Sequence, residues 1–330
     1  MIRFHRRLSS VDERFIGDRR GLTTLPITPS FDPIPSRAQS DEVRGAPLTH
    51  VSLVSSFLRH GYVRVRNALD LSPGSRLQVF FETTLRREGL TVDGRLTVPP
   101  GVTSLPPTRV ADLADVAPTL WAAVCALLGG AGRIKRPARL GNALICNFRT
   151  TGLADSWHVD GDFFVHHPDS PEQALLLFVL WTDVEEGEGA TLAAPSATAG
   201  LLRHLARHPA GLTSAHIPAR DFVGDPARHL SLTGKAGDAW ILHPLTAHQS
   251  APNPRGRPRF ISNPVVALEA PLNLADGPAP KSPLEELTRR LLGRPWTPHA
   301  DAVRHTFVPG RIDRWDGEGT YTDRSSAPSP

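Results

Sequence analysis

Hydrophobic residues along the chain change from a helical to a strand pattern near residue 140. Before that point, apolar side chains recur at helical spacing over 49–60, 72–88 and 109–128, and a strand pattern begins at Tyr62. Beyond it, short apolar runs are separated by turn residues, which is typical of strands. We expect these strands at 140–148, 173–183, 228–233, 238–243 and 259–268, and helices at 197–208 and 283–293. The pattern therefore predicts a mainly β protein with flanking helices.

The run 173–183 differs from the other expected strands because it is apolar at successive positions. A strand with one face in water alternates apolar and polar residues, whereas a strand covered on both faces does not. This run is therefore expected to lie at the centre of the core. The Gly-rich segment 187–190 that follows is expected to turn the chain back. The 32 prolines and 27 glycines also favour many turns and short strands.

The two ends of the chain differ in composition from its middle. Residues 1–48 are rich in Pro, Arg and Ser and have weak periodicity, so we expect a partly irregular N-terminal extension. Residues 317–330 have the composition of a polar tail. The stretch between them, 49–316, is expected to be one domain whose β-core covers about 140–268.

Composition excludes several classes of protein. The net charge is only +4, the arginines are dispersed, and no basic run is interleaved with aromatic residues, so nucleic-acid binding is not expected. No apolar run approaches the roughly 20 residues that span a bilayer, and no apolar stretch follows the basic N-terminus. The two cysteines lie in apolar segments and are interpreted as reduced. We therefore expect a cytoplasmic protein.

Three His-x-Asp triplets are candidates for metal chemistry, and His158-Val-Asp160 has the most favourable surroundings. In a strand, residues two apart project to one face, so this imidazole and carboxylate would lie side by side. The triplet His167-Pro-Asp169 resembles a turn, and His299-Ala-Asp301 lies in a Pro-rich run. A second histidine from a distant strand would complete a two-His, one-carboxylate face. Non-haem Fe(II) uses such a face and keeps the remaining positions open.

The segment around His248 supplies the second histidine and a candidate anion receptor. On an extended chain the Ser250 hydroxyl points the same way as the His248 ring. Turn residues fill 251–258, so the chain is expected to reverse and return antiparallel, with Arg259 beside Ser250. A guanidinium and a hydroxyl in this arrangement bind a carboxylate. A dicarboxylate could then bind the metal at one end and Arg259 at the other.

The order His158-x-Asp160, His248-x-Ser250 and Arg259 resembles the Fe(II)/2-oxoglutarate-dependent oxygenases, and most of all their phytanoyl-CoA dioxygenase-like branch. The resemblance covers roughly residues 50–268. It implies a double-stranded β-helix, the jelly roll of cupin-like proteins. It also implies that His158, Asp160 and His248 bind iron, and that Arg259 and Ser250 bind the distal carboxylate of 2-oxoglutarate.

The function implied by this resemblance is hydroxylation of a small molecule by dioxygen, with release of succinate and CO₂. Halogenating relatives carry a small residue where this chain has Asp160, which favours hydroxylation or a related desaturation. The alternative is a jelly-roll binding protein that has no redox activity or uses another metal. Such a protein has no need for the dicarboxylate receptor of Ser250 and Arg259. The substrate stays open, because one fold hosts many reactions.

Further residues are candidates for lining the site. Asn147 and Thr191 are candidate partners for the keto acid end of 2-oxoglutarate. Trp157, Phe163 and Phe164 flank the metal triplet and are candidates for the substrate wall, although ordinary packing aromatics would look the same.

Other residues compete for the assigned roles. His243 competes with His248, but it has no Ser two residues on and its offset to Arg259 does not fit the resemblance. Arg257 competes with Arg259 but lies deeper in the expected turn. His204 and His208 lie four apart on an expected helix, where zinc binding would need a third ligand.

Overall fold

The computed structural model describes residues 50–92, 95–96, 101–105, 112–140, 144–300, 302, 304–306, 312–315 and 321–323. The chain divides into two compact units, 1–37 and 38–330, and every described residue belongs to the second. The expected N-terminal extension, 1–48, lies outside the described residues.

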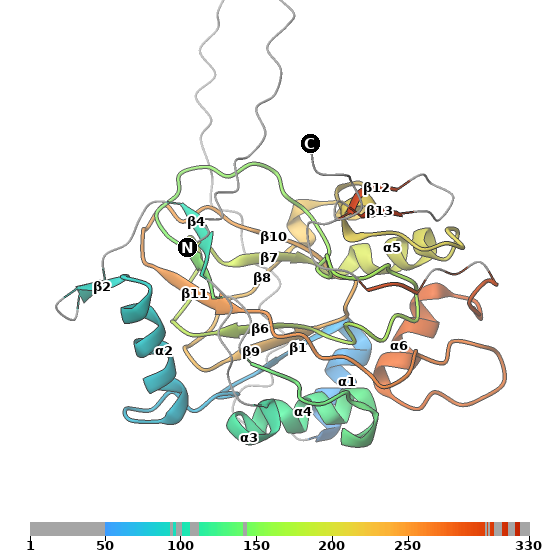
Figure 1. Cartoon of the computed structure of the whole chain (residues 1–330), viewed down its shortest axis with the longest axis horizontal. Coiled ribbons are helices and arrows are strands. Elements are labelled where there is room, and N and C mark those ends of the chain that lie inside the picture. The colour runs from blue at the N-terminus through green and yellow to red at the C-terminus, as the bar shows by residue number, and fades with distance from the viewer. Residues whose placement is uncertain are drawn as a thin grey trace, which may run out of the picture. The chain divides into compact units, whose positions relative to one another are not determined.

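A six-stranded antiparallel sheet forms the larger β layer, with β6 at an inner position (Figure 1). In spatial order its strands are β1 (Tyr62–Val65), β9 (Ala239–Leu242), β6 (Leu176–Leu180), β11 (Arg259–Ser262), β5 (Ile145–Asn147) and β4 (Val102–Ser104). Every residue of β6 is buried, which confirms the central, doubly covered strand expected within 173–183. The predicted strand at 259–268 ends early, at Ser262. Pro264 follows and has no N–H for the ladder, and single bridges form at Val266 and Leu268.

A smaller antiparallel sheet lies over the larger one (Figure 1), in the order β10 (Ala247–Ser250), β7 (Thr191–Ala194) and β8 (Leu230–Ser231). Alternate side chains of β6 point toward it, because successive strand residues face opposite sides. The apolar cluster between the sheets contains Leu176, Phe178, Leu180, Val184, Ala190, Ala193, Leu232, Trp240, Leu242 and Ile261. The other side chains of β6, including Leu177 and Val179, belong to the main core with the helices.

The helices contribute to that main core, which contains Phe57, Leu120 and Leu287. They are α1 (His50–His60), α2 (Arg76–Arg87), α3 (Leu113–Val116), α4 (Pro118–Leu128), α5 (Thr198–Leu205) and α6 (Pro283–Leu292). Four of the predicted helices are confirmed with small shifts at their ends. The single helix expected at 109–128 is two helices, α3 and α4, because Pro118 lacks the N–H that would continue α3.

Short elements complete the described fold. The 3-10 helices are η2 (Ala131–Arg133), η3 (Pro195–Ala197), η4 (Ser214–His216), η5 (Ala219–Phe222) and η6 (Pro226–Arg228). Two-stranded sheets pair β2 (Thr91–Val92) with β3 (Arg95–Leu96), and β12 (Ile312–Trp315) with β13 (Tyr321–Asp323). Strand β13 lies within the expected polar tail, whose other residues are outside the described part. No described helix combines the length and hydropathy needed to cross a bilayer.

Gly237 and Asp238 anchor the start of β9, the strand that leads toward His248. Gly237 has a φ of +90°, and a Cβ there would lie 2.8 Å from the Leu69 carbonyl oxygen. The buried Asp238 carboxylate accepts hydrogen bonds from the Arg64 guanidinium (2.7 Å) and from the backbone N–H groups of Asn67 and Lys235 (both 2.9 Å). These contacts join β9 to the end of β1.

Replacing Asp238 with alanine is expected to lower the free energy of unfolding by about 3–5 kcal/mol. The substitution leaves the Arg64 charge and two backbone donors without their acceptor in a largely buried place. Urea denaturation of both proteins measures the difference. The control is Asp155→Ala, which removes an exposed ion pair with Arg220 and should cost less than about 1 kcal/mol. Equal effects of the two substitutions would contradict this role of Asp238.

Candidate metal centre

The structure brings the predicted iron ligands His158, Asp160 and His248 together. One ligand atom of each lies within 4.8 Å of those of the other two. The Asp160 Oδ1 atom is 3.4 Å from His248 Nε2 and 3.6 Å from His158 Nε2. Among the residues that the structure describes, this is the one group of three His, Cys, Asp or Glu side chains with such geometry. The two imidazoles and the carboxylate therefore form a compact candidate metal face.

The backbone that holds His158 differs from the prediction. His248 lies on β10, as expected, but His158 belongs to no regular strand and pairs with His248 through an isolated antiparallel bridge. The two residues exchange N–H···O bonds of 3.1 and 3.0 Å. Asp160 lies in a bend that continues into Gly161, whose φ is +101°. A Cβ at Gly161 would lie 2.4 Å from the Phe164 ring, so this tight bend requires glycine.

Backbone carbonyls fix the tautomer of both histidines. The Nδ1 atom of His158 is 2.7 Å from the Ser156 oxygen, and that of His248 is 3.1 Å from the Thr246 oxygen. A carbonyl can only accept a hydrogen bond, so Nδ1 carries the proton in each ring. Each Nε2 therefore faces the shared space beside Asp160, where it can hydrogen-bond the carboxylate while it carries a proton and can offer its lone pair to a metal ion once that proton has left.

The charge of Asp160 suits a cation site. Burial by itself raises the pKa of this carboxyl group. The nearby His248 and the hydrogen bonds with His158 and His248 outweigh that effect and hold the pKa well below its usual value. Asp160 is therefore ionised at neutral pH. The His158 side chain is 49% exposed and the His248 side chain only 5%, so the centre opens on the side of His158.

A buried guanidinium lies beyond the metal face. Arg259 is 1% exposed, and its Nη2 atom is 3.4 Å from the Ser250 hydroxyl. Its Nε and Nη1 atoms have no hydrogen-bond partner among the described residues. Burial lowers the pKa of Arg259 to about 10, which still leaves it protonated at neutral pH. A buried cation with unused donors is destabilising by itself, so this arrangement suits a bound anion.

The distance between the two parts fits a small dicarboxylate. Ser250 follows His248 by two residues on β10, so their side chains project to the same side. Two residues of antiparallel strand span about 7 Å. A five-carbon diacid is of this length, so one end can reach the metal face while the other reaches Ser250 and Arg259.

The chain reaches Arg259 by a route that the sequence did not predict. Strands β10 and β11 do not form the expected antiparallel pair: in the described sheets β10 pairs with β7, while β11 pairs with β5 and β6. Residues 251–258 instead cross from the smaller to the larger sheet, because the prolines among them cannot continue a ladder. The buried Asn253 fixes the crossing through bonds to the Thr150 hydroxyl (2.7 Å) and the Asn147 carbonyl (3.0 Å). Ser250 and Arg259 thus meet as side chains from different sheets.

Asn147 and Thr191 lie near the receptor rather than near the metal face. Asn147 is opposite Arg259 in the sheet register, and Thr191 is opposite Ser250. Both N–H donors of the Asn147 amide are used, on the carbonyls of Gly189 (3.1 Å) and Ala251 (2.8 Å). These bonds occupy the amide N–H donors, while the buried Asn147 Oδ1 atom has no hydrogen-bond partner among the described residues. The role of Asn147 at the keto acid end of 2-oxoglutarate stays a prediction.

A known protein family matches the part of the chain that contains the metal face and Arg259. The model of the phytanoyl-CoA dioxygenase family matches residues 57–261, which is more than half of the chain. The chain belongs to the phytanoyl-CoA dioxygenase family. This confirms the resemblance seen in the sequence, and with it Fe(II) and 2-oxoglutarate as the cofactors. No curated protein matches the chain significantly.

Several solved structures resemble this family member, all at low identity. The epimerase SnoN in complex with Fe³⁺, alpha-ketoglutarate and nogalamycin RO is 19% identical, with a TM-score of 0.41, and the match covers 68% of this chain and 85% of SnoN. The carbocyclase SnoK is 20% identical, with a TM-score of 0.42 and coverage of 72% and 96%. EvdO2 from Micromonospora carbonacea var. aurantiaca, complexed with 2-oxoglutarate, is 16% identical, with a TM-score of 0.44 and coverage of 72% and 96%. The assignment to the phytanoyl-CoA dioxygenase family rests on the family match.

The competing residues of this phytanoyl-CoA dioxygenase family member have other contacts. His243 is buried, with Nε2 3.1 Å from the Thr288 hydroxyl and Nδ1 accepting from the Leu245 N–H. Arg257 is exposed and pairs with Glu188 at 3.0 Å. His243 is thus a core residue, and Arg257 is a surface residue of the crossing segment. His204 and His208 lie on or beside α5 with ring centroids 4.4 Å apart, and the described residues offer them no third ligand.

Acid should destabilise the protein through His243. Burial lowers the pKa of His243 to about 3, from 6.5 in an exposed histidine, so the unfolded chain takes up a proton below pH 6.5 while the native state does not. Stability is then full above pH 6.5 and falls as the pH drops toward 3, by about 2 kcal/mol at pH 5 from this residue. Urea denaturation at pH 7 and pH 5 measures the loss. In His243→Gln the loss should be smaller by that amount, and an unchanged loss would contradict the assignment.

The three aromatic residues expected in the substrate wall differ in their surroundings. Trp157 is half-buried, and its ring meets that of His229 edge-on, with 4.6 Å between the centroids. Phe163 is half-buried against Phe164, with 5.0 Å between the centroids. Phe164 is fully buried and lies 4.1 Å from the His166 ring. Trp157 and Phe163 keep exposed surface, and Phe164 lines a small cavity together with Asp160 and His166. The substrate-wall role of these three aromatic residues stays a prediction.

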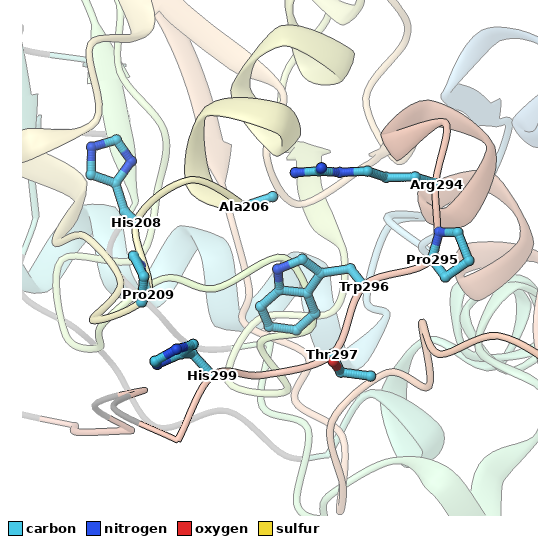
Figure 2. A pocket seen from close by; sticks show the side chains of 8 residues that line it. All are labelled: Ala206, His208, Pro209, Arg294, Pro295, Trp296, Thr297 and His299. Atoms are coloured by element: carbon cyan, nitrogen blue, oxygen red, sulfur yellow. The ribbon is translucent and has the colours of Figure 1, made fainter.

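Among the described residues, the other two His-x-Asp triplets supply no ligand to the group of His158, Asp160 and His248. The buried Asp169 binds the Arg304 guanidinium at 2.6 Å, so its charge is already paired. His299 lines a cavity of about 280 Å³ between the end of α5 and the segment after α6, while Asp301 lies outside the described residues. Figure 2 shows Trp296 in the middle of this lining, with His208 and His299 on one side and Arg294 on the other. This cavity shares no residue with the metal centre.

Two functional contacts were missed from the sequence. Asn263 donates a 2.6 Å hydrogen bond to Asp160 Oδ2, and Asn253 holds the crossing segment as described above. The signal for Asn253 was its place between two prolines, where a polar residue often anchors a turn. Asn263 gave no such signal, because its partner is 103 positions away in the chain.

Proposed function

We propose that this protein is an Fe(II)- and 2-oxoglutarate-dependent dioxygenase that hydroxylates a small molecule and releases succinate and CO₂. The observation that carries the proposal is the buried Arg259, whose unused donors lie about two strand residues beyond the metal face. A protein that bound only a metal would have no use for this buried charge. The two stacked antiparallel sheets support a double-stranded β-helix as the fold.

The residues present fit both cofactors. His158 and His248 offer neutral imidazole nitrogens and Asp160 offers one negative charge, a set that non-haem Fe(II) accepts with positions to spare. When bound, Fe(II) couples the oxidative decarboxylation of 2-oxoglutarate by dioxygen to oxidation of a substrate C–H bond. One oxygen atom ends in succinate and the other in the hydroxyl group, so the reaction balances without a further reductant.

The anion receptor supplies affinity and orientation for the co-substrate. The Nε and Nη1 donors of Arg259 suit the distal carboxylate, and a guanidinium holds a carboxylate in a fixed plane through paired bonds. The Ser250 hydroxyl lies beside the same guanidinium. Thr191, opposite Ser250, is proposed to line this end of the pocket. Asn147 is proposed to shape the pocket by joining the segments of Gly189 and Ala251.

Hydroxylation is the outcome that the ligand set favours. Asp160 occupies the position where halogenating relatives leave room for chloride, and its carboxylate is ionised. The half-exposed Trp157 and Phe163 are proposed to contact the substrate beside the open edge of His158. We also propose that the domain covers 49–316 and works in the cytoplasm, where the free cysteines Cys125 and Cys146 would stay reduced.

The test is turnover of 2-oxoglutarate. The purified protein is mixed anaerobically with Fe(II), ascorbate and 2-oxoglutarate, then exposed to air, and succinate is measured. We expect succinate well above that of a His158→Ala control. Absence of succinate together with absence of 2-oxoglutarate binding would favour the alternative, a jelly-roll binding protein without redox activity.

A further inference from the structure

The carboxylate of Asp160 is held by an amide from the larger sheet. Asn263 follows the last residue of β11, and its Nδ2 atom donates to Asp160 Oδ2 at 2.6 Å. The other oxygen, Oδ1, is the one that lies 3.4 and 3.6 Å from the two imidazoles. The two oxygens of this carboxylate therefore have different tasks.

This contact differs in kind from those that orient the histidines. Backbone carbonyls orient both rings, those of Ser156 for His158 and Thr246 for His248. A substitution leaves a backbone carbonyl in place. The orienting partner described for Asp160 is a side chain. A substitution at that partner can therefore change the orientation of the carboxylate.

The chemical nature of Asn263 suits this task. An amide N–H is a neutral donor, so it fixes one carboxylate oxygen without cancelling the negative charge that attracts a divalent cation. An arginine or lysine in this place would bind the carboxylate more strongly and reduce its charge toward the metal. Groups that orient metal ligands in this way typically change metal affinity about 10- to 100-fold when removed.

We propose that Asn263 is a positioning residue that confines Asp160 to metal binding through Oδ1 alone, which keeps a coordination position open for dioxygen. The inference rests on the proposed function, since it concerns the same metal. Asn263 lies four residues after Arg259, so one strand and its end supply both the co-substrate receptor and the group that orients the carboxylate.

The test replaces Asn263 with leucine, which has a similar shape and no donor. Co(II), a spectroscopically visible substitute for Fe(II), is titrated into the metal-free protein with and without 2-oxoglutarate. We expect the Co(II) dissociation constant to rise about 10- to 100-fold in Asn263→Leu. We also expect the visible Co(II) spectrum to change, because freed Oδ2 can join Oδ1 on the metal. A loss of packing alone would not change the spectrum.

The matched control is Asn273→Leu. Asn273 is also half-buried, but its Oδ1 atom accepts from the Ala275 N–H at 3.2 Å instead of contacting a metal ligand. This variant should keep the wild-type Co(II) affinity and spectrum. Thermal unfolding of both metal-free variants, and of Asn263→Ala, separates a folding defect from a metal defect. If Asn263→Leu unfolds, the same Co(II) measurements on Asn263→Ala decide.

Two results would overturn the inference, and they are distinguishable. Co(II) affinity within twofold of wild type and an unchanged spectrum in a folded Asn263 variant would refute the role of Asn263 while leaving the proposed function intact. Failure of the wild-type protein itself to bind Co(II) would instead remove the proposed function, and the role of Asn263 with it.

Discussion

Replacing His248 with alanine is expected to abolish metal-dependent turnover, lowering succinate formation more than about 100-fold. The loss should exceed the 10- to 100-fold that is typical for an orienting residue, because a ligand itself is removed. His248 is the most buried of the three candidate ligands, at 5% exposure, so solvent cannot replace its nitrogen without opening the space between the sheets. Succinate formation measures the loss of turnover, and Co(II) titration calorimetry measures the loss of metal binding.

Two other histidines provide controls for this result. His50 is exposed on α1, so His50→Ala should keep wild-type metal binding and turnover. His243→Ala should lower thermal stability, because the imidazole fills a buried place beside Thr288, yet it should still bind Co(II). Metal binding that survives in His248→Ala and disappears in His243→Ala would reverse the assignment of the third ligand.

Replacing Arg259 with methionine is expected to have opposite effects on stability and on function. Methionine is similarly long but uncharged, so it removes a buried cation whose Nε and Nη1 lack partners among the described residues. Replacing buried charged groups with apolar ones often stabilises a protein by about 1–4 kcal/mol, so the unliganded variant should melt at a higher temperature. Its affinity for 2-oxoglutarate should fall more than about 100-fold, since truncating one partner of a buried charge pair costs several kcal/mol.

Thermal unfolding with and without 2-oxoglutarate, and titration calorimetry, test both effects together. The matched control is Arg290→Met on the exposed side of α6, which should change neither quantity. Wild-type affinity for 2-oxoglutarate in Arg259→Met would contradict the receptor. A large loss of stability without ligand would show that Arg259 serves the fold.

The features that followed from the sequence are those that depend on local pattern. The apolar run around β6 predicted its burial, because a strand between two layers needs apolar residues at every position. The convergence of His158 and His248 was predicted from the order and spacing of His158-x-Asp160, His248-x-Ser250 and Arg259 taken together. Composition alone could not predict which histidines meet, because histidines are scattered along the chain.

The features that did not follow depend on contacts between distant segments. The pattern at 251–258 indicated a turn, but it did not indicate that the chain passes from one sheet to the other. Prolines exclude a strand ladder in this segment, but they do not determine which strand the chain joins next. Asn147 was predicted at the keto acid end from its type and its strand, and the sequence could not indicate which contacts its amide makes. Only the fold reveals that the carbonyls of Gly189 and Ala251 already use both donors. Likewise, the bend at Gly161 replaced the regular strand expected for His158 and Asp160.

The unequal exposure of the two imidazoles has a consequence for metal exchange. An ion arriving from solvent meets the half-exposed His158 first and reaches the buried His248 only after shedding water, and a departing ion follows the same path in reverse. Chelators and competing ions such as zinc or nickel can reach the site along this edge. A substitution that covered the exposed edge of His158 should therefore slow both the loading and the loss of the metal.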